Sequence, residues 1–256
     1  MPYEVVGTGM LAGAFGAVAN TGPPAVVCAA GVADSRCSDA LAFRRERNLL
    51  QSLTHRARVS DSVLVYFSGA PVYGRATGMR LETARGAPET PYGRHKLECE
   101  RLVADSGARC LILRLPNVVG STGNPNQLIP SLVAQVARGS VVVMTEATRD
   151  LLDVDDLVAI VGALLGRGVA DAVLNVASGV STPVLRLTED ISAILGLSPT
   201  IVLVDGGDRQ EFSIAMVRDL LPDYPRFHDD YPAQVLIRRV PSILRSLQER
   251  DVEGTA

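Results

Sequence analysis

Short apolar runs alternate with longer amphipathic stretches in the N-terminal half of the chain. The apolar runs have the length of buried strands, and the amphipathic stretches repeat their apolar positions at helical spacing. Strands that alternate with helices in this way predict a parallel sheet wound by right-handed crossovers. The predicted strands are residues 4–7, 25–30, 62–67 and 110–113, and the predicted helices are residues 11–15, 39–55 and 92–105.

The second half continues the alternation less regularly, with no internal repeat. We therefore expect an α/β fold: a Rossmann-type core sheet with a small C-terminal lobe over the strand ends. The core is expected at residues 1–120 and about 149–178, and the substrate-binding lobe at about 121–148 and 179–256. Helices are predicted at residues 127–138, 155–166, 184–195 and 233–249, and strands at 140–144, 172–176 and 201–204.

Composition narrows the possible functions. The 256 residues are 47% hydrophobic and 21% charged, which supports a sizeable core, and the net charge of -3 argues against nucleic acid or an anionic membrane as partner. No apolar run approaches the roughly 20 residues that span a bilayer, and no basic segment precedes the apolar N-terminal stretch. The four cysteines have no metal-ligand spacing. We expect a cytoplasmic protein with reduced cysteines and no metal site.

A glycine-rich turn lies between the first predicted strand and helix, with the pattern Gly7-x-Gly9-x-x-Ala12. In this position the free N–H groups and dipole of a helix N-terminus can bind a pyrophosphate. A βα turn without any ligand is the alternative. The next strand ends in Ala29-Ala30-Gly31, with neither a carboxylate nor an arginine to contact the adenosine ribose. The choice between NAD and NADP is therefore left open.

Tyr92 and Lys96 form the strongest chemical signal. They are four residues apart in a predicted helix and so share one face. Lys96 is the sole lysine among 25 basic residues, and an ammonium beside a phenol lowers the pKa of the phenol. Such a tyrosine can exchange a proton with a hydroxyl or carbonyl group. The alternative is a solvated lysine beside an unrelated tyrosine.

Several short motifs, each weak alone, follow one another along the chain. They are Gly7-x-Gly9-x-x-Ala12, Phe67-Ser68, Val72-Tyr73-Gly74, Tyr92-x-x-x-Lys96, and residues 113–120, 149–156 and 175–179. In order and spacing they resemble the extended short-chain dehydrogenase/reductase family of the NAD-dependent epimerase/dehydratase type. Within that family the chain is similar to a compact subgroup of nucleotide-linked hexose 4-ketoreductases.

The resemblance implies reduction of a keto group on a nucleotide-linked 6-deoxyhexose by NADPH or NADH, in natural-product deoxysugar biosynthesis. It further implies a homodimer formed through the helices near 39–55 and 92–106. A nucleotide-sugar epimerase and a non-catalytic NAD(P) sensor or scaffold are the alternatives. The implied catalytic residues are Tyr92, Lys96 and Ser68; the implied cofactor-binding residues are Gly7, Gly9, Met10, Leu11, Ala29, Ala30, Gly31, Lys96 and Asn117; and the implied substrate-binding residues are Arg149, Asn117 and Tyr73.

Two departures from the family pattern bear on function. Only about 20 residues separate the glycine turn from the strand ending near Ala29, so the sheet is expected to be truncated, lacking the usual second and third strands. The family's catalytic Ser or Thr falls at Gly69, one residue after Ser68. The next positions, Ala70 and Pro71, lack the acidic groups of the dehydratases, which argues against dehydration.

Overall fold

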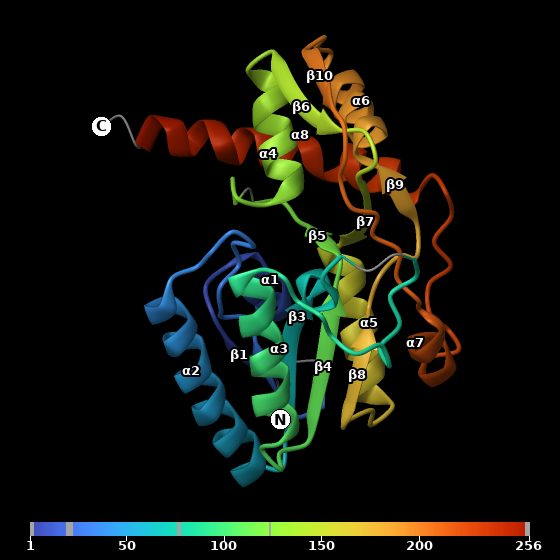
Figure 1. The fold of residues 1–256 in the computed structure, drawn as a ribbon. Helices are drawn as coiled ribbons and strands as arrows, with labels where there is room; N and C mark the ends of the chain where they lie inside the picture. Colours follow the sequence, from blue (N-terminus) through green and yellow to red (C-terminus); the bar gives the residue numbers. More distant parts are fainter. Residues whose placement is uncertain (1–2, 19–22, 76–77, 123, 254–256) are drawn as a thin grey trace.

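A five-stranded parallel sheet forms the centre of the computed structural model, which describes residues 3–18, 23–75, 78–122 and 124–253 (Figure 1). The strand order is β1-β2-β3-β4-β8, and each neighbouring pair is parallel. The predicted Rossmann-type α/β fold is confirmed. The strands are β1 (Glu4–Val6), β2 (Ala25–Cys28), β3 (Val63–Gly69), β4 (Cys110–Leu115) and β8 (Ala172–Asn175).

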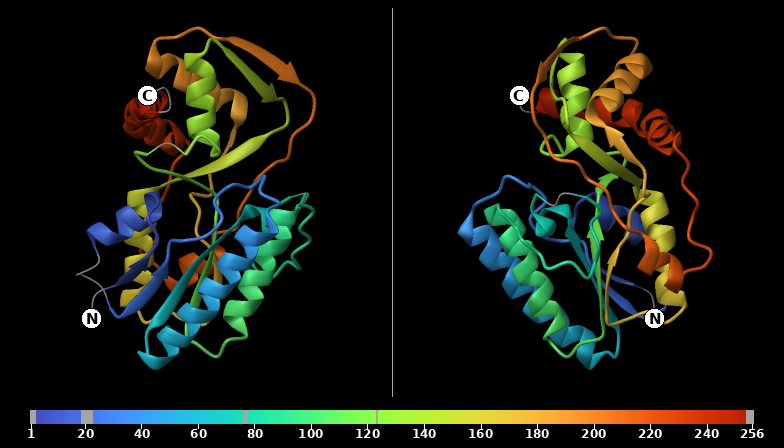
Figure 2. Two further views of the ribbon diagram at one scale, coloured as in Figure 1. Left: turned by 90° about the vertical axis from the view of Figure 1, so that its left-hand side faces the viewer. Right: turned by 45° about the vertical axis from the view of Figure 1, so that its right-hand side comes forward.

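Successive strand side chains point to opposite sides of the sheet. Because consecutive residues of β2, β3 and β4 are buried, both faces of the sheet are covered by helices. Tyr66 packs in the cluster formed with α2 (Ala40–Val59) and α3 (Pro91–Ala104). Its neighbour Phe67 packs in the cluster that contains α1 (Met10–Ala17) and α5 (Val154–Gly166). Figures 1 and 2 show α2 and α3 side by side along one face. This layering brings α2 and α3 together beside the end of β3.

A second hydrophobic cluster builds the lobe seen at the top of Figure 1. Three short strands, β5, β7 and β9, connect the lobe to the core, and the pair β6 and β10 forms its outer sheet. The three short strands were not predicted. The strands are β5 (Asn117–Val119), β6 (Ser140–Met144), β7 (Thr148–Asp153), β9 (Ser181–Pro183) and β10 (Thr200–Val204), and the helices are α4 (Leu128–Ala137), α6 (Val184–Leu195) and α8 (Tyr231–Glu253).

One part of the expected lobe packs elsewhere. Phe212, Val217 and Tyr224 belong to the cluster of the central sheet, and α7 (Ala215–Leu220) contacts β8. This segment therefore belongs by packing to the core, although it lies within the range 179–256 assigned to the lobe from sequence.

Two further features concern the edge of the sheet and membranes. Within the described ranges β1 pairs with β2 alone and forms one edge of the sheet. None of the described helices has the length and apolar character needed to cross a bilayer.

Candidate active site

The glycine turn is shaped by close backbone contact. Gly7 has φ +139°, and a Cβ there would lie 2.6 Å from the carbonyl carbon of Ala29, so the end of β1 rests directly on the end of β2. Gly9 is the N-cap residue of α1, and no side chain of the described chain caps that helix. A Cβ on Gly9 would meet no described atom within 4 Å. The turn therefore offers an open helix N-terminus beside Ala29 and Ala30, which fits the pyrophosphate of a dinucleotide.

Met10 and Leu11, the other residues predicted for this region, begin α1. A Cβ on Gly120 would collide with Met10, and Leu11 packs against the sheet core. Gly31 follows β2 at φ +151°, where a Cβ would lie 2.7 Å from a carboxylate oxygen of Glu46. Met10 and Leu11 thus pack at the start of α1, whereas Gly31 packs against Glu46.

The first turn of α3 places Tyr92 at the end of β3. The Thr90 hydroxyl accepts a hydrogen bond from the N–H of Gly93 at 3.0 Å, and Pro91 occupies the first turn. A Cβ on Gly93 would lie 2.5 Å from the carbonyl oxygen of Pro71. Glycine at this position lets α3 pack against the 3₁₀ turn η1 (Ala70–Tyr73), which directly follows β3.

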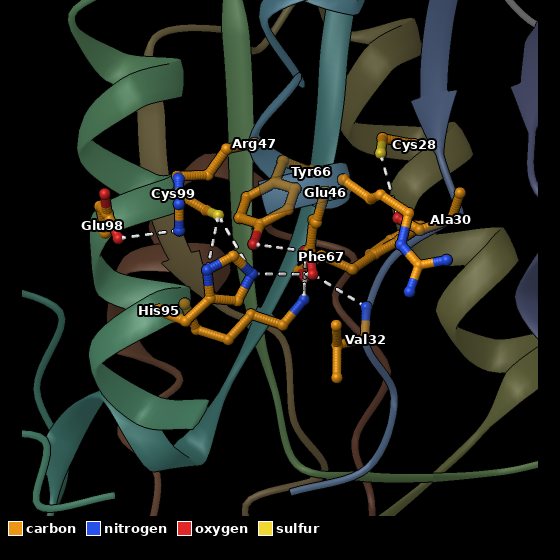
Figure 3. Close-up of polar contacts among 12 residues, drawn as sticks. Cys28, Ala30, Val32, Glu46, Arg47, Tyr66, Phe67, His95, Glu98 and Cys99 are labelled. Atoms are coloured by element: carbon orange, nitrogen blue, oxygen red, sulfur yellow. Dashed lines mark hydrogen bonds and ion pairs between the residues drawn. The ribbon is translucent and has the colours of Figure 1, made fainter. Parts of the chain in front are cut away.

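Lys96 lies one turn further along α3 and is buried. Its Nζ is 5.8 Å from the centre of the Tyr92 ring and 5.2 Å from that of Tyr66. The ammonium donates to Oε1 of Glu46 at 2.8 Å and to the carbonyl oxygen of Phe67 at 3.4 Å (Figure 3). The structure thus brings Tyr92 and Lys96 together beside β3, as their spacing predicts.

Glu46 is a site residue that the sequence analysis did not identify. It lies on α2 and is 3% exposed, and Figure 3 shows its carboxylate among side chains from α3 and β3. The available signal was a carboxylate between Phe43 and Leu50 on the apolar face of a helix. The four donors around its two oxygens are the Val32 N–H at 2.8 Å, the Tyr66 hydroxyl at 3.1 Å, His95 Nε2 at 3.0 Å and Lys96 Nζ at 2.8 Å.

The electrostatics correct one sequence-based expectation. Burial raises the pKa of Tyr92 above 10.0; Lys96 opposes this rise and Glu46 adds to it. The direction expected of Lys96 is right, but the net shift is upward, because desolvation of the phenolate outweighs the ammonium. Tyr92 is therefore a protonated phenol near neutral pH, ready to donate a proton.

Glu46 and Lys96 each stabilise the ionised form of the other. Burial by itself raises the pKa of Glu46, but hydrogen bonds from His95 and Lys96 hold it at about 2. Burial by itself lowers the pKa of Lys96, but Tyr92 and Glu46 carry it above its usual value. Both groups are ionised near neutral pH. Glu46, His95 and Cys99 also place one possible metal-ligand atom each within 4.8 Å of the others, and of these three residues Glu46 accepts a hydrogen bond from the Lys96 ammonium.

Ser68 is 6% exposed, and its hydroxyl has no hydrogen-bond partner among the residues that the structure describes. Because strand side chains alternate, Ser68 shares the sheet face of Tyr66, toward α3. Gly69 caps η1. A buried, unpartnered hydroxyl is uncommon, because it loses its hydration without compensation. Ser68 thus carries a buried, unpartnered hydroxyl at the end of β3, on the sheet face that α3 covers.

The predicted substrate-binding residues separate into two groups. Arg149 pairs with Asp208 at 2.8 Å, and the Asn117 amide donates to the Asp150 carbonyl at 3.2 Å and to Gln210 at 3.4 Å. These contacts join β7 and β5 to the segment at 208–210. Tyr73, by contrast, is 4% exposed and donates to Asn175 at 2.7 Å. The hydroxyl of Tyr73 therefore makes a buried structural hydrogen bond, which does not fit the substrate-binding role predicted for this residue.

A cavity of about 220 Å³ lies between η1, the start of α3 and the segment at 208–210. Pro71 and Thr90 line it from the core side, and Asp208 and Gln210 line it from the segment that Arg149 and Asn117 contact. It therefore adjoins the first turn of α3, where Tyr92 lies.

Comparison with known proteins defines the class. The chain belongs to the NAD dependent epimerase/dehydratase family, whose profile matches residues 14–177. GDP-6-deoxy-D-mannose reductase of Pseudomonas aeruginosa is 30% identical over 197 residues, which cover 71% of this chain and 63% of that protein. The chain thus spans less than two thirds of that relative.

Solved structures agree with this assignment. RMD from Pseudomonas aeruginosa, complexed with NADPH, is 25% identical with a TM-score of 0.72, covering 89% of this chain and 84% of that one. MoeE5 in complex with UDP-glucose and NAD shares the fold with a TM-score of 0.74 at 24% identity, covering 88% and 80% of the two chains.

Proposed function

We propose that this protein is an NAD(P)H-dependent reductase that reduces the keto group of a nucleotide-linked 6-deoxyhexose, acting at carbon 4 in natural-product deoxysugar biosynthesis. The observation that carries the proposal is the position of the Tyr92 phenol beside Lys96 at the end of β3, where burial raises the pKa of the phenol. Reduction of a ketone needs a proton donor, whereas oxidation of a hydroxyl needs a base. The relative named as a 6-deoxymannose reductase supports the substrate class.

The cofactor fits the open end of the sheet. The uncapped N-terminus of α1 and the Gly7–Gly9 turn would bind its pyrophosphate. Two of the three N–H groups of the Lys96 ammonium donate to Glu46 and to the carbonyl oxygen of Phe67. The third N–H would bind the nicotinamide ribose. When bound, the reduced nicotinamide would supply the hydride. RMD from Pseudomonas aeruginosa, solved with NADPH, supports this type of cofactor.

The edge position of β1 favours a cofactor that exchanges. In the described chain β1 pairs with β2 alone, so the support for adenosine that two further strands would supply is proposed to be absent. A weakly held cofactor suits a reductase, which must release the oxidised form after each turnover. An epimerase regenerates its cofactor in place and retains it.

The proposed role of each site residue follows from its position. Tyr92 donates its phenolic proton to the oxygen of the ketone as that oxygen becomes an alkoxide, and the Lys96 ammonium stabilises the resulting phenolate. Ser68 would donate its unpartnered hydroxyl to the same oxygen. Arg149 pairs with Asp208, which lines the cavity. The Arg149 guanidinium would release Asp208 and bind the diphosphate of the substrate instead.

The test is a reductase assay in which the nicotinamide absorbance is followed. The purified protein is incubated with NADPH or NADH and with guanosine- and thymidine-diphosphate 4-keto-6-deoxyhexoses, and Tyr92→Phe serves as the control. Oxidation of the cofactor that requires both the sugar and Tyr92 is the expected result. Interconversion of sugars without added reductant would identify an epimerase instead. Cofactor binding without any turnover would identify a sensor.

A further inference from the structure

The carboxylate of Glu46 is built into the floor of the site. Its Oε1 accepts from Lys96 and Tyr66, and its Oε2 accepts from Val32 and His95 (Figure 3). The donors come from the segment after β2, from β3 and from α3. His95 is itself held by stacking on Phe43 at 4.2 Å between ring centres. One carboxylate therefore ties together the three elements that surround Lys96.

The pair of Glu46 and Lys96 is also a local charge balance. Both side chains are buried, at 1% and 6% exposure. An uncompensated charge at this depth would act strongly on any ionisable neighbour, because burial weakens screening by water. The neighbour that matters is Tyr92, whose ring lies 5.8 Å from the ammonium.

We propose that Glu46 is a positioning residue, which fixes the Lys96 ammonium at the end of β3 and balances its charge so that Tyr92 remains a proton donor. That Tyr92 donates a proton to a substrate rests on the proposed function, whereas the effect of Glu46 on the pKa of Tyr92 does not. During reduction the O–H bond of Tyr92 breaks, its electron pair stays on the phenolate, and the proton forms the new hydroxyl of the sugar. The hydride donor is the reduced nicotinamide already proposed.

Other titratable groups that face this cluster come from every element packed around it. Upward contributions to the pKa of Tyr92 also come from Asp34 and Cys37, after that of Glu46. The titratable neighbours are Cys28 on β2, Asp34 and Cys37 in the segment that follows, Glu46 on α2, Tyr66 on β3, and His95 and Cys99 on α3. Among these neighbours, Glu46 is the one that accepts a hydrogen bond from Lys96 within the described chain.

The experiment titrates Tyr92 in the protein without cofactor. The tyrosinate absorbance is followed with rising pH, and the difference between each protein and its Tyr92→Phe counterpart isolates Tyr92 from the other five of the six tyrosines. Glu46→Gln is expected to lower the midpoint by about one pH unit, because the Lys96 charge is no longer balanced. Glu100→Gln is the matched control.

Glu100 is likewise a buried carboxylate, paired with Arg114 at 2.7 Å one helical turn beyond Lys96. Like Glu46→Gln, Glu100→Gln removes a buried negative charge and is expected to destabilise the fold. It should leave the midpoint of the Tyr92 titration unchanged. Since an isolated buried ammonium can itself prevent folding, the titration is repeated in a Lys96→Met background. There, too, Glu46→Gln is expected to lower the midpoint, because it removes a negative charge near the phenol.

A Tyr92 midpoint that is unchanged or raised by Glu46→Gln in both backgrounds overturns the proposal. The titration needs neither cofactor nor substrate, so it separates this proposal from the proposed function. Where reductase turnover is measured, the fall of kcat at alkaline pH should move to lower pH in Glu46→Gln and stay in place in Glu100→Gln.

Discussion

Replacing Gly93 by alanine tests how α3 positions Tyr92. The added Cβ would lie 2.5 Å from the carbonyl oxygen of Pro71, 3.1 Å from its carbonyl carbon, and 3.0 Å from Cβ of Pro88. The first two atoms are backbone at the start of η1, so no side-chain rotation can relieve the contact. The first turn of α3 must lift away from η1, and Tyr92 must move with it.

The expected cost follows from this overlap. Inserting one methyl group into a tightly packed contact typically costs about 1–3 kcal/mol, and we expect the free energy of unfolding to fall by that amount. For a chain of this size the melting temperature would drop by roughly 2–12 °C. A displacement of about 1 Å at a reacting group can cost about 100-fold in rate, so reductase turnover should fall by about that factor.

Gly16→Ala is the matched control. Gly16 also lies in a helix, but a Cβ there would meet no described atom within 4 Å. Alanine at such a position is expected to stabilise the helix by about 0.5–1 kcal/mol. Urea unfolding of the two variants and the parent protein measures both effects. If Gly93→Ala proved as stable as Gly16→Ala, the close packing of α3 on η1 would be refuted as the device that positions Tyr92.

The remaining predictions use the same preparations. Tyr92→Phe should lower reductase turnover by about 10²–10⁴-fold with urea unfolding unchanged; a near-normal rate would remove the phenol from the mechanism. Arg239→Met removes the closest cation of buried Asp153 and leaves Arg238 at 3.1 Å, so it should cost about 1.5–3 kcal/mol. The same change at exposed Arg186 should cost less than about 1 kcal/mol, and equal costs in urea would contradict this. Burial raises the pKa of Asp150 from 3.8 to about 7, so the folded state holds an extra proton between these values. Stability should therefore fall as pH rises from about 4 to about 7, and Asp150→Asn should abolish that slope in urea unfolding. A homodimer through α2 and α3 is expected from light scattering at micromolar concentration, and a monomer mass would exclude it.

Local patterns in the sequence determined much of the architecture. Runs such as 62–67 and 110–113 are short, apolar and separated by helical periods, and they became β3 and β4. The Tyr92–Lys96 spacing also needed only local information, because residues four apart on a helix share a face whatever surrounds them. The glycine turn could also be predicted from local sequence, because it lies directly between a predicted strand and a predicted helix.

The tertiary structure alone decided the electrostatic state of the site. Glu46 and Lys96 are 50 positions apart, and their contact exists because α2 and α3 pack on the same sheet face. That contact, with the burial of the phenol, sets the pKa of Tyr92 above its usual value, whereas the local sequence pointed to a lowered one. The pairing of Arg149 with Asp208 is likewise a long-range contact. Burial and charge balance depend on what packs around a group, and residues distant in the chain supply that packing.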